Sequence, residues 1–314
     1  MARFVKVASV AIKIPSYSEK PEGMHLSDFM VGEIRKQVAQ VLPDKPDLIV
    51  LPEVCDRPEG MPKEAVRAFY DERGDRTVNG LAQIAKENNC YIAAGVVRDA
   101  PGGKRYNSCV MIDRQGTVMG YYDKNYVVPW ETPTYGILSG EDIAVFDCDF
   151  GRVGAVICFD LNFEEMRKKY RDAKCDLIVF PSHFDGGVLR SIFAHETGAY
   201  FVDCYAGRFS RASVFDPLGG EVAVSSNYYQ YVVTTLNLDY KICYLDENWD
   251  RFTAARQKYG SDVMIQDNGY EGSILLFSES PHRTADAIVQ EFGIELREDY
   301  FARSRAHREQ NLKG

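Results

Sequence analysis

Short apolar runs rich in β-branched residues alternate with longer amphipathic segments along the first third of the chain. Alternating apolar and polar positions predict a strand, whereas apolar positions three or four apart predict a helix. In chain order the pattern predicts strand 4–12, helix 27–41, strand 47–51, a helix around 81–85 and strand 91–97. This order is typical of an α/β protein rather than an all-β one.

A hairpin and a weak internal repeat extend this pattern. Strands 108–112 and 117–122 flank a turn from Asp113 to Gly116, where the glycine favours a hairpin. The second half repeats the order, with strand 152–157, helix 161–170, strand 176–180, helix 190–197, strand 200–204 and a hairpin over 213–224. Two similar halves predict two sheets packed face to face with helices outside, a four-layer α-β-β-α sandwich of the α/β class.

The pattern changes after about residue 240. The remaining sequence predicts a charged helix near 247–258, a short strand over 273–277 and a helix over 284–292. We therefore expect one large domain over residues 1–240 and a C-terminal extension over residues 241–314. The extension either packs on its own domain or reaches across a partner subunit, and the second option requires a dimer.

Composition narrows the class of protein. The 314 residues carry 37 basic and 46 acidic side chains, a formal net charge of -9, and 45% of them are hydrophobic. These proportions exclude disordered and collagen-like chains, and the acidic balance disfavours a nucleic-acid partner, because phosphate binding depends on clustered Lys and Arg. No apolar run approaches the roughly 20 residues needed to cross a bilayer, and no signal peptide is recognisable. We expect a cytoplasmic protein without a membrane partner.

Eight cysteines are scattered along the chain without a C-x-x-C pair. This distribution suggests neither a metal site nor a compact disulfide framework, so most should be buried thiols. Cys158 differs because it ends a Val-rich strand and begins a predicted helix, where a thiol is presented to substrate and the helix N-terminus favours the thiolate. An ordinary thiol pKa of about 8.5 leaves little thiolate at neutral pH, so a base or cation must lie beside it.

Histidine is the most common acid–base residue, and His183 follows a predicted strand end. We interpret it as a residue that lines a pocket, with catalytic base as the less favoured alternative. Charged residues at strand ends offer a base of another type. Glu53 follows Leu51 and Pro52, and Lys124 follows Tyr122 and Asp123.

These residues form motifs that resemble the nitrilase superfamily of carbon–nitrogen hydrolases. Its signature is a Glu after a Leu-Pro strand end, a Lys after a strand end that contains Tyr, and a Cys in the pattern Ile-Cys-aromatic-Asp. The chain has these motifs in the same order, at Glu53, Lys124 and Cys158. The likeness covers residues 1 to about 240, and the fold it implies is the same four-layer sandwich.

The resemblance implies a Glu-Lys-Cys triad, together with a further Glu for which Glu131 is the best candidate. Glu53 is expected to take the thiol proton, which is easier if its pKa lies towards the working range. Lys124 and the Phe159 N–H are expected to stabilise the oxyanion formed when Cys158 attacks a carbonyl carbon. No cofactor or metal is required, and the resemblance implies a homodimer or a higher oligomer.

Several positions depart from the family pattern. Phe159 and Asp160 stand where nitrile-hydrolysing members have Trp-Glu, and Tyr126 replaces a common His. Leu161 and Asn162 occupy the positions where branches that bind acidic substrates often carry Arg. Neutral amides are therefore favoured over acidic ones unless Arg190 or Arg208 supplies the missing cation from another loop.

The sequence thus predicts a thiol amidohydrolase that cleaves a non-peptide C–N bond of a small amide or N-carbamoyl compound through a Cys thioester. The alternatives are a nitrilase, or a catalytically silent scaffold or sensor on the same fold. The candidates for substrate contact are Phe159, Trp130, Tyr126, His183 and Asn162.

Overall fold

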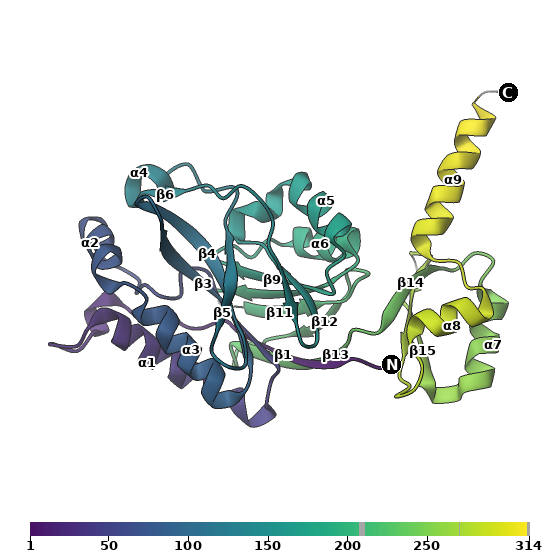
Figure 1. Ribbon diagram of the computed structural model, residues 1–314, viewed down its shortest axis with the longest axis horizontal. Helices are drawn as coiled ribbons and strands as arrows, with labels where there is room; N and C mark the ends of the chain where they lie inside the picture. The colour runs from purple at the N-terminus through teal and green to yellow at the C-terminus, as the bar shows by residue number, and fades with distance from the viewer. Residues whose placement is uncertain (207–210, 270, 313–314) are drawn as a thin grey trace. The chain divides into compact units, whose positions relative to one another are not determined.

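The computed structural model describes residues 1–206, 211–269 and 271–312. The chain divides into two compact units, one formed by Lys6–Thr235 and the other by Met1–Val5 together with Leu236–Gly314 (Figure 1). The change of unit thus falls near the expected position 240, and the first five residues join the second unit. That residues 1–240 alone carry the hydrolase function stays a prediction.

The first unit contains two sheets. The first has the strand order β13-β1-β2-β3-β4-β5, with β6 beside β4, and its β1, β2 and β3 are parallel. These strands are β1 Phe4–Val10, β2 Leu48–Leu51, β3 Tyr91–Ala100, β4 Lys104–Ile112, β5 Val118–Asp123, β6 Ile137–Leu138 and β13 Tyr231–Asn237. All four residues of β2 are buried, as expected of a central parallel strand covered on both faces.

The second sheet has the order β12-β11-β10-β9-β8-β7, with β8, β9 and β10 parallel. Its strands are β7 Val145–Cys148, β8 Gly151–Ala155, β9 Leu177–Ser182, β10 Tyr200–Tyr205, β11 Arg211–Phe215 and β12 Glu221–Val224. The two sheets pack face to face. Ser9 Oγ of β1, for example, donates a hydrogen bond to the carbonyl oxygen of Asp203 in β10 at 2.6 Å.

Helices cover the outer faces of both sheets. α1 (Leu26–Val38) and α3 (Arg76–Asn88) pack together on the first sheet, and α5 (Glu164–Ala173) and α6 (Val188–Thr197) on the second (Figure 1). The four-layer α-β-β-α sandwich is therefore confirmed, as are the hairpins β4–β5 and β11–β12. Two further helices, α2 (Lys63–Arg73) and α4 (Glu131–Tyr135), lie on the same unit. Within the described residues no helix is long and apolar enough to cross a membrane.

One predicted element needs correction. A single helix over 161–170 was expected to begin just after Cys158, but the chain forms a 3₁₀ turn over Cys158–Asn162, and α5 begins only at Glu164. Four short 3₁₀ segments occur among the described residues, at Tyr17–Glu19, Leu42–Asp44, Cys158–Asn162 and Gly260–Asp262. The thiol is therefore carried by a tight turn and not by the first turn of an α-helix.

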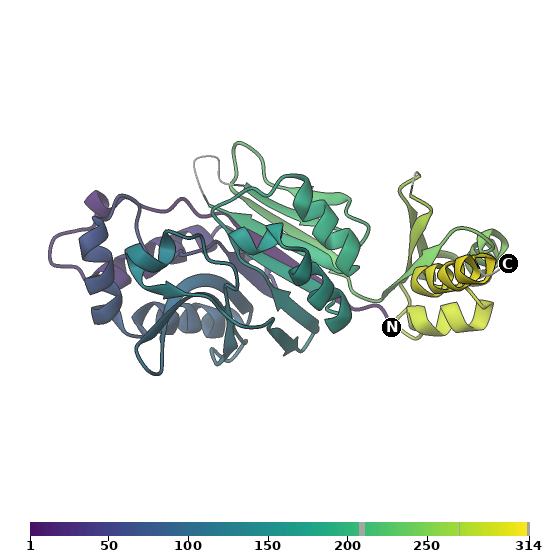
Figure 2. The ribbon, with the colours of Figure 1, turned by 90° about the horizontal axis from the view of Figure 1, so that it is seen from above.

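The second unit has its own sheet and core. β14 (Tyr240–Tyr244), β16 (Ser273–Ser278) and β15 (Val263–Asp267) form an antiparallel sheet in that order. It is joined by α7 (Trp249–Tyr259), α8 (Ala285–Phe292) and α9 (Arg297–Asn311) (Figure 2). Phe252, Leu276 and Ile288 lie in the buried cluster between sheet and helices. The sequence predicted α7, β16 and α8 but not β14, β15 or α9.

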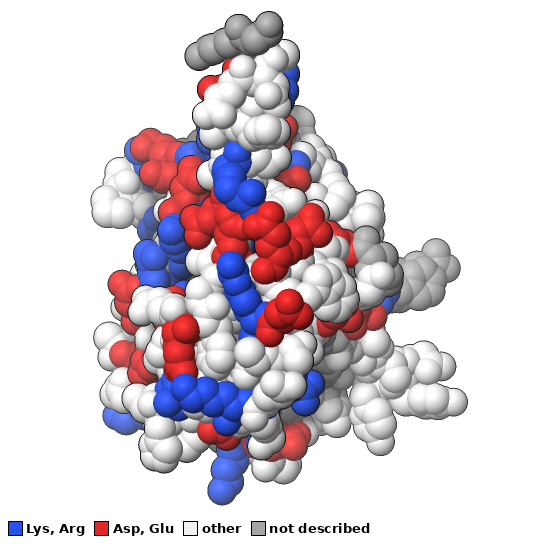
Figure 3. All heavy atoms as spheres, turned by 90° about the vertical axis from the view of Figure 1, so that its right-hand side faces the viewer, with Lys and Arg blue, Asp and Glu red and all other residues white. Residues whose placement is uncertain are grey.

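The surface of the second unit is charged but of mixed sign. Acidic and basic side chains lie next to one another in Figure 3, and many form ion pairs, such as Arg303 with Glu295 and Lys258 with Glu291. The face of this unit seen in Figure 3 therefore carries charges of both signs close together.

Candidate active site

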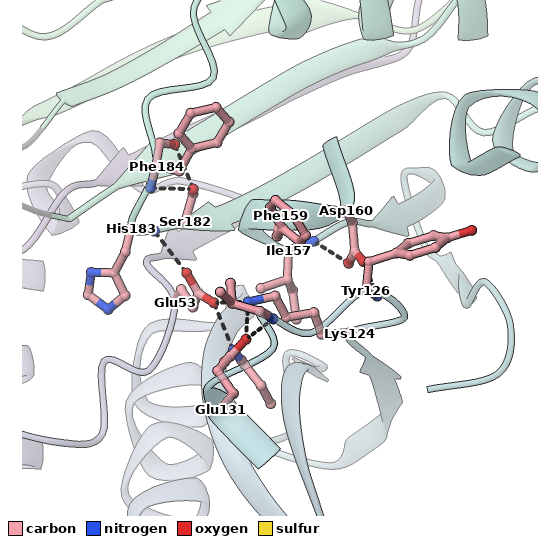
Figure 4. Close-up of polar contacts among 12 residues, drawn as sticks. Glu53, Lys124, Tyr126, Glu131, Ile157, Phe159, Asp160, Ser182, His183 and Phe184 are labelled. Carbon is pink, nitrogen blue, oxygen red and sulfur yellow. Dashed lines mark hydrogen bonds and ion pairs between the residues drawn. The ribbon is translucent and has the colours of Figure 1, made fainter. Parts of the chain in front are cut away.

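Four functional candidates follow the C-terminal ends of four strands. Glu53 follows β2, Lys124 follows β5, Cys158 follows β8 and His183 follows β9. Because β2 and β5 belong to one sheet and β8 and β9 to the other, face-to-face packing of the sheets brings these loops to one place (Figure 4). The ends of parallel strands are a usual position for sites in α/β folds.

Glu53 is buried, with 3% of its surface exposed, and both of its carboxylate oxygens accept hydrogen bonds. Oε1 accepts from Lys124 Nζ at 2.9 Å and from Asn107 Nδ2 at 2.7 Å. Oε2 accepts from the backbone N–H of His183 at 2.9 Å. The carboxylate is thus fixed in position by three donors.

Lys124 joins Glu53 to a second buried carboxylate. Its Nζ lies 3.0 Å from Glu131 Oε2, which also accepts from the Val128 N–H at 2.6 Å. Asn107 Nδ2 contacts both acids, lying 3.3 Å from Glu131 Oε1. Sequence reasoning missed Asn107, which stands just before the strand predicted over 108–112 and among Arg105, Tyr106 and Ser108, so no pattern in the sequence singles it out.

The electrostatics of this group differ from expectation. Burial alone would raise the pKa of Glu53, but the ammonium of Lys124 and the nearby His183 outweigh it and lower the pKa to about 2. Burial alone would lower the pKa of Lys124, but the carboxyl groups of Glu53 and Glu131 outweigh it and raise the pKa. At neutral pH Glu53 is therefore a carboxylate beside the Lys124 ammonium, and it can accept a proton.

Cys158 lies in a strained turn. Its φ of 47° is in the left-handed region, as is that of Val54 next to Glu53. Such a conformation costs about 1–3 kcal/mol for a residue with a side chain, and it is concentrated at functional sites. Burial and the charge of Glu53 raise the pKa of the Cys158 thiol well above its ordinary value. The sequence expectation that the turn lowers this pKa is therefore wrong for the resting site, in which the thiol is neutral.

Two glycines allow the backbone of these loops to approach the strands. A Cβ on Gly95 of β3 would lie 2.4 Å from Glu53 Cα, and a Cβ on Gly140 would lie 2.2 Å from the carbonyl oxygen of Asp123. Neither site accepts a larger residue without moving the backbone beside Glu53 or Lys124. Gly140, whose N–H also donates to the Lys124 carbonyl oxygen at 2.8 Å, thus helps to fix the backbone at Lys124.

Comparison with known proteins agrees with this geometry. The model of the family described as carbon–nitrogen hydrolase matches residues 6–227. The chain belongs to this family. The nitrilase-superfamily resemblance of its motifs is therefore confirmed.

Individual relatives of this carbon–nitrogen hydrolase are distant. The omega-amidase NIT2 of Bos taurus is 28% identical over 196 residues, which cover 59% of this chain and 65% of the bovine protein, just under two thirds of its length. Nit3 of Saccharomyces cerevisiae, a member of branch 10 of the nitrilase superfamily, superposes with a TM-score of 0.65 at 19% identity, covering 82% of this chain and 95% of that one. An amidase from Nesterenkonia sp. superposes with a TM-score of 0.63 at 17% sequence identity, covering 75% of this chain and 91% of the amidase. These structures share the fold.

The carbon–nitrogen hydrolase also holds a buried carboxylate that supports the Cys158 turn. Asp160 accepts hydrogen bonds from the Tyr122 hydroxyl at 2.7 Å, the Tyr126 N–H at 2.7 Å and the Ile157 N–H at 3.1 Å. Burial raises its pKa to about 6, although these three donors oppose the shift. Its protonation state therefore changes close to neutral pH.

We predict that the acid limb of kcat/KM lies near pH 6 and belongs to Asp160. Below that pH the protonated carboxyl can accept fewer of the three hydrogen bonds that shape the turn over Cys158–Asn162, so the geometry at the thiol changes although the neutral form is favourable for folding. Because the Asp160 pKa is higher in the folded protein than its unfolded value of 3.8, the neutral form of Asp160 is the one that favours folding. Its contribution to stability is complete below pH 3.8 and is lost as pH rises through about 6. A rate profile over pH 5–8 tests this, since Asp160→Asn should lower the plateau about tenfold and remove the limb. A limb unmoved in Asp160→Asn would contradict the assignment.

A cavity of about 360 Å³ is lined by Val54, Arg57, Glu59, Tyr135 and His183, among others. Of these, Val54 follows Glu53 in the chain and His183 donates its N–H to the Glu53 carboxylate. Of the five predicted substrate contacts, His183 therefore reaches the cavity. Its ring Nδ1 lies 2.7 Å from the Ala206 carbonyl oxygen, so its bonded groups are backbone atoms and Glu53. This arrangement suits a lining residue better than a catalytic base.

The other four predicted contacts are not among the residues that line this cavity. The ring of Tyr126 stacks on Phe163 with centroids 3.6 Å apart, and Phe159 meets Phe163 edge-on. Asn162 Nδ2 donates to the Phe159 carbonyl oxygen at 2.9 Å and so closes the turn. Trp130 is 53% exposed. Their roles as substrate contacts stay predictions.

The two arginines considered for binding an acidic substrate do not serve in that way. Arg190 is buried and pairs with Asp203, and its Nη1 also lies 3.1 Å from Ser213 Oγ. Its charge is therefore already neutralised. Arg208 lies outside the described residues.

Proposed function

We propose that the protein is a thiol amidohydrolase that cleaves the C–N bond of a small amide through a thioester on Cys158. The observation that carries the proposal is the buried Glu53–Lys124 pair with an ionised carboxylate beside a neutral thiol. A binding protein gains nothing from burying two carboxylates and an ammonium beside a thiol, because burial of charges opposes folding.

The charges suggest the order of steps. The thiol proton moves to Glu53 while the sulfur of Cys158 bonds to the carbonyl carbon, because a free thiolate is too unfavourable to form first. The ammonium of Lys124 and the N–H of Phe159 stabilise the oxyanion, a donor of this kind being worth about 3–4 kcal/mol. Protonated Glu53 then gives its proton to the departing nitrogen, and ammonia or an amine leaves.

Hydrolysis of the thioester uses the same groups in reverse roles. Glu53 takes a proton from water as the water oxygen attacks the thioester carbon, and that proton returns to the sulfur when the acid product leaves. Glu131 accepts from Lys124 throughout, and we propose that it keeps this ammonium aimed at the reacting carbonyl. No cofactor enters this scheme.

Relatives support the choice of reaction. The bovine relative is named an omega-amidase, and variants of the Nesterenkonia amidase carry acrylamide, or the acetamide moiety of fluoroacetamide, bonded to the active-site cysteine. These facts concern those proteins, in which the sulfur bonds to a carbon outside the amide group and not to the carbonyl carbon, and they favour Cys158 as the nucleophile here. We also propose a homodimer, which a measurement of molecular mass in solution would test.

The decisive experiment measures ammonia release from a panel of small amides and their parent nitriles. We expect release from an amide, and loss of at least about 10³-fold in Cys158→Ser. Acrylamide should label Cys158 ahead of Cys148, the other half-buried thiol and so an internal control. Direct consumption of a nitrile would instead indicate a nitrilase. No turnover, with equal slow labelling of both thiols, would indicate a silent scaffold.

A further inference from the structure

A buried asparagine contacts three of the residues that form the candidate active site. Asn107 of β4 is fully buried. Its Nδ2 donates to Glu53 Oε1 at 2.7 Å and to Glu131 Oε1 at 3.3 Å. Its backbone carbonyl oxygen accepts from the Lys124 N–H at 2.9 Å. One strand residue therefore holds both acids through its side chain and the lysine through its backbone.

The amide of Asn107 and the ammonium of Lys124 connect the same two acids. Lys124 Nζ lies 2.9 Å from Glu53 Oε1 and 3.0 Å from Glu131 Oε2. Glu53 Oε1 therefore has two donors, of which one is charged and the other neutral. A second cation in place of the amide would lie beside Lys124 and be opposed by repulsion between like charges. The neutral amide fixes the Glu53 carboxylate without that cost.

The Asn107 amide is oriented by the acids and not by the surrounding protein. Its Oδ1 is buried and accepts no hydrogen bond from the described residues. Turning the amide over would place this oxygen against two acidic groups, so only one orientation is compatible with the site. Asn248, by contrast, uses both amide atoms, since its Nδ2 donates to the Tyr244 carbonyl oxygen at 2.7 Å and its Oδ1 accepts from the Glu295 N–H at 3.1 Å. Asn107 therefore contributes less to folding than Asn248 does.

We propose that Asn107 is a positioning residue that holds Glu53 in one orientation, ready to take the proton of the Cys158 thiol. Burial raises the pKa of Glu53, but Lys124, His183 and the Asn107 hydrogen bond together lower it to about 2. A base that turns away from the thiol loses the geometry that proton transfer requires. The inference rests on the proposed amidase function, in which Glu53 is the base, and it adds a residue to that reaction.

The first test is Asn107→Leu, which removes both donors and keeps nearly the same side-chain shape. We expect kcat for amide hydrolysis to fall by about 30–100-fold, because the base is no longer held in place. KM should change by less than about threefold, since the substrate loses no contact. The melting temperature should stay within about 4 °C of the wild type, because the lost hydrogen bonds are offset by removal of the unpaired Oδ1.

Asn248→Leu is the matched control for this change. Asn248 is also fully buried, but it lies in the second unit and its amide bonds are all satisfied. Its loss should lower the melting temperature further than Asn107→Leu does and change kcat by less than about threefold. A loss of kcat below threefold in Asn107→Leu would overturn the inference.

The second test is Asn107→Asp, because a carboxyl group donates a hydrogen bond only when it is protonated. Burial next to Glu53 should raise the pKa of the new group, so its donor is present at low pH and lost as pH rises. The ratio of variant to wild-type kcat/KM should therefore rise by about 10–100-fold from pH 8 to pH 5. Dividing by the wild-type value removes the limb expected from Asp160. A ratio independent of pH would assign Asn107 a steric role only and overturn the inference.

Unfolding by urea separates this inference from the proposed function. A group whose pKa is raised in the folded protein favours folding at low pH and loses that contribution as pH rises through the folded value. Asn107→Asp should therefore be destabilised more at pH 8 than at pH 5. If no amide is hydrolysed but this pH dependence is found, the amidase proposal fails and the hold of Asn107 on Glu53 stands. If amides are hydrolysed but neither the kcat/KM ratio nor the stability difference responds to pH, the inference fails and the amidase proposal stands.

Discussion

Replacing Glu53 with glutamine should lower kcat for amide hydrolysis by about 10³–10⁴-fold, because the site loses the base for both the thiol and the attacking water. Glutamine has the same shape, and Lys124 keeps its contact with Glu131, so the fold should persist. The Cys158 thiol should become easier to ionise, since the Glu53 charge is one cause of its raised pKa. Alkylation of Cys158 at pH 8 should thus become faster while turnover collapses. Ammonia release and alkylation rates measure the two effects.

The matched control for this change is Glu59→Gln. It also removes one carboxylate near the cavity, but Glu59 is exposed and none of its contacts reach Lys124 among the bonds found in the described residues. It should reduce kcat by less than about threefold, within the range of surface substitutions. A loss below tenfold in Glu53→Gln, or slower alkylation of Cys158, would show that another group is the base.

The fold and the positions of the carboxylate, the ammonium and the thiol could be predicted because strand ends are visible in the sequence. Runs such as Leu48–Leu51 and Leu177–Ser182 are apolar and bounded by polar residues, and the residues that follow them must lie at the sheet edge. The motif resemblance then selected Glu53, Lys124 and Cys158. Their positions along the chain did not predict the distances between their side chains, because those distances depend on how the two sheets pack.

The charge balance and the cavity could not be predicted in this way. Glu53 acquires its low pKa from donors at 107, 124 and 183, which lie on different strands or loops and whose joint effect depends on burial. In the sequence Arg57 follows Asp56 and stands near Glu59. Only the structure shows that Asp56 pairs with Arg73 and that Arg57 lines the cavity. The second unit was underestimated because α9 is charged along its length and its residues 301–312 are exposed.

Replacement of Lys124 with methionine should have the largest combined effect on stability and activity. Glu53 and Glu131, 3% and 5% exposed, would then be buried without a cation, and loss of one partner from such a group costs about 3–5 kcal/mol. The oxyanion would also lose its ammonium, so kcat should fall by at least about 10³-fold. Unfolding by urea and ammonia release measure the two losses, with Lys36→Met as the control because Lys36 is exposed and pairs only with Glu33 among the described residues.

The pH dependence of stability should change sign in the same variant. In the wild type the Glu53 pKa of about 2 lies below its unfolded value of 4.5, so its contribution is complete above pH 4.5 and is lost as pH falls towards 2. Without Lys124, burial and the neighbouring Glu131 raise the pKa of Glu53 above the unfolded value, so Lys124→Met should be more stable at pH 5 than at pH 7. Adding Glu131→Gln should recover part of the loss at pH 7. Equal stability losses at both pH values would show that Lys124 contributes packing rather than charge, because a purely steric defect does not respond to protonation of its neighbours.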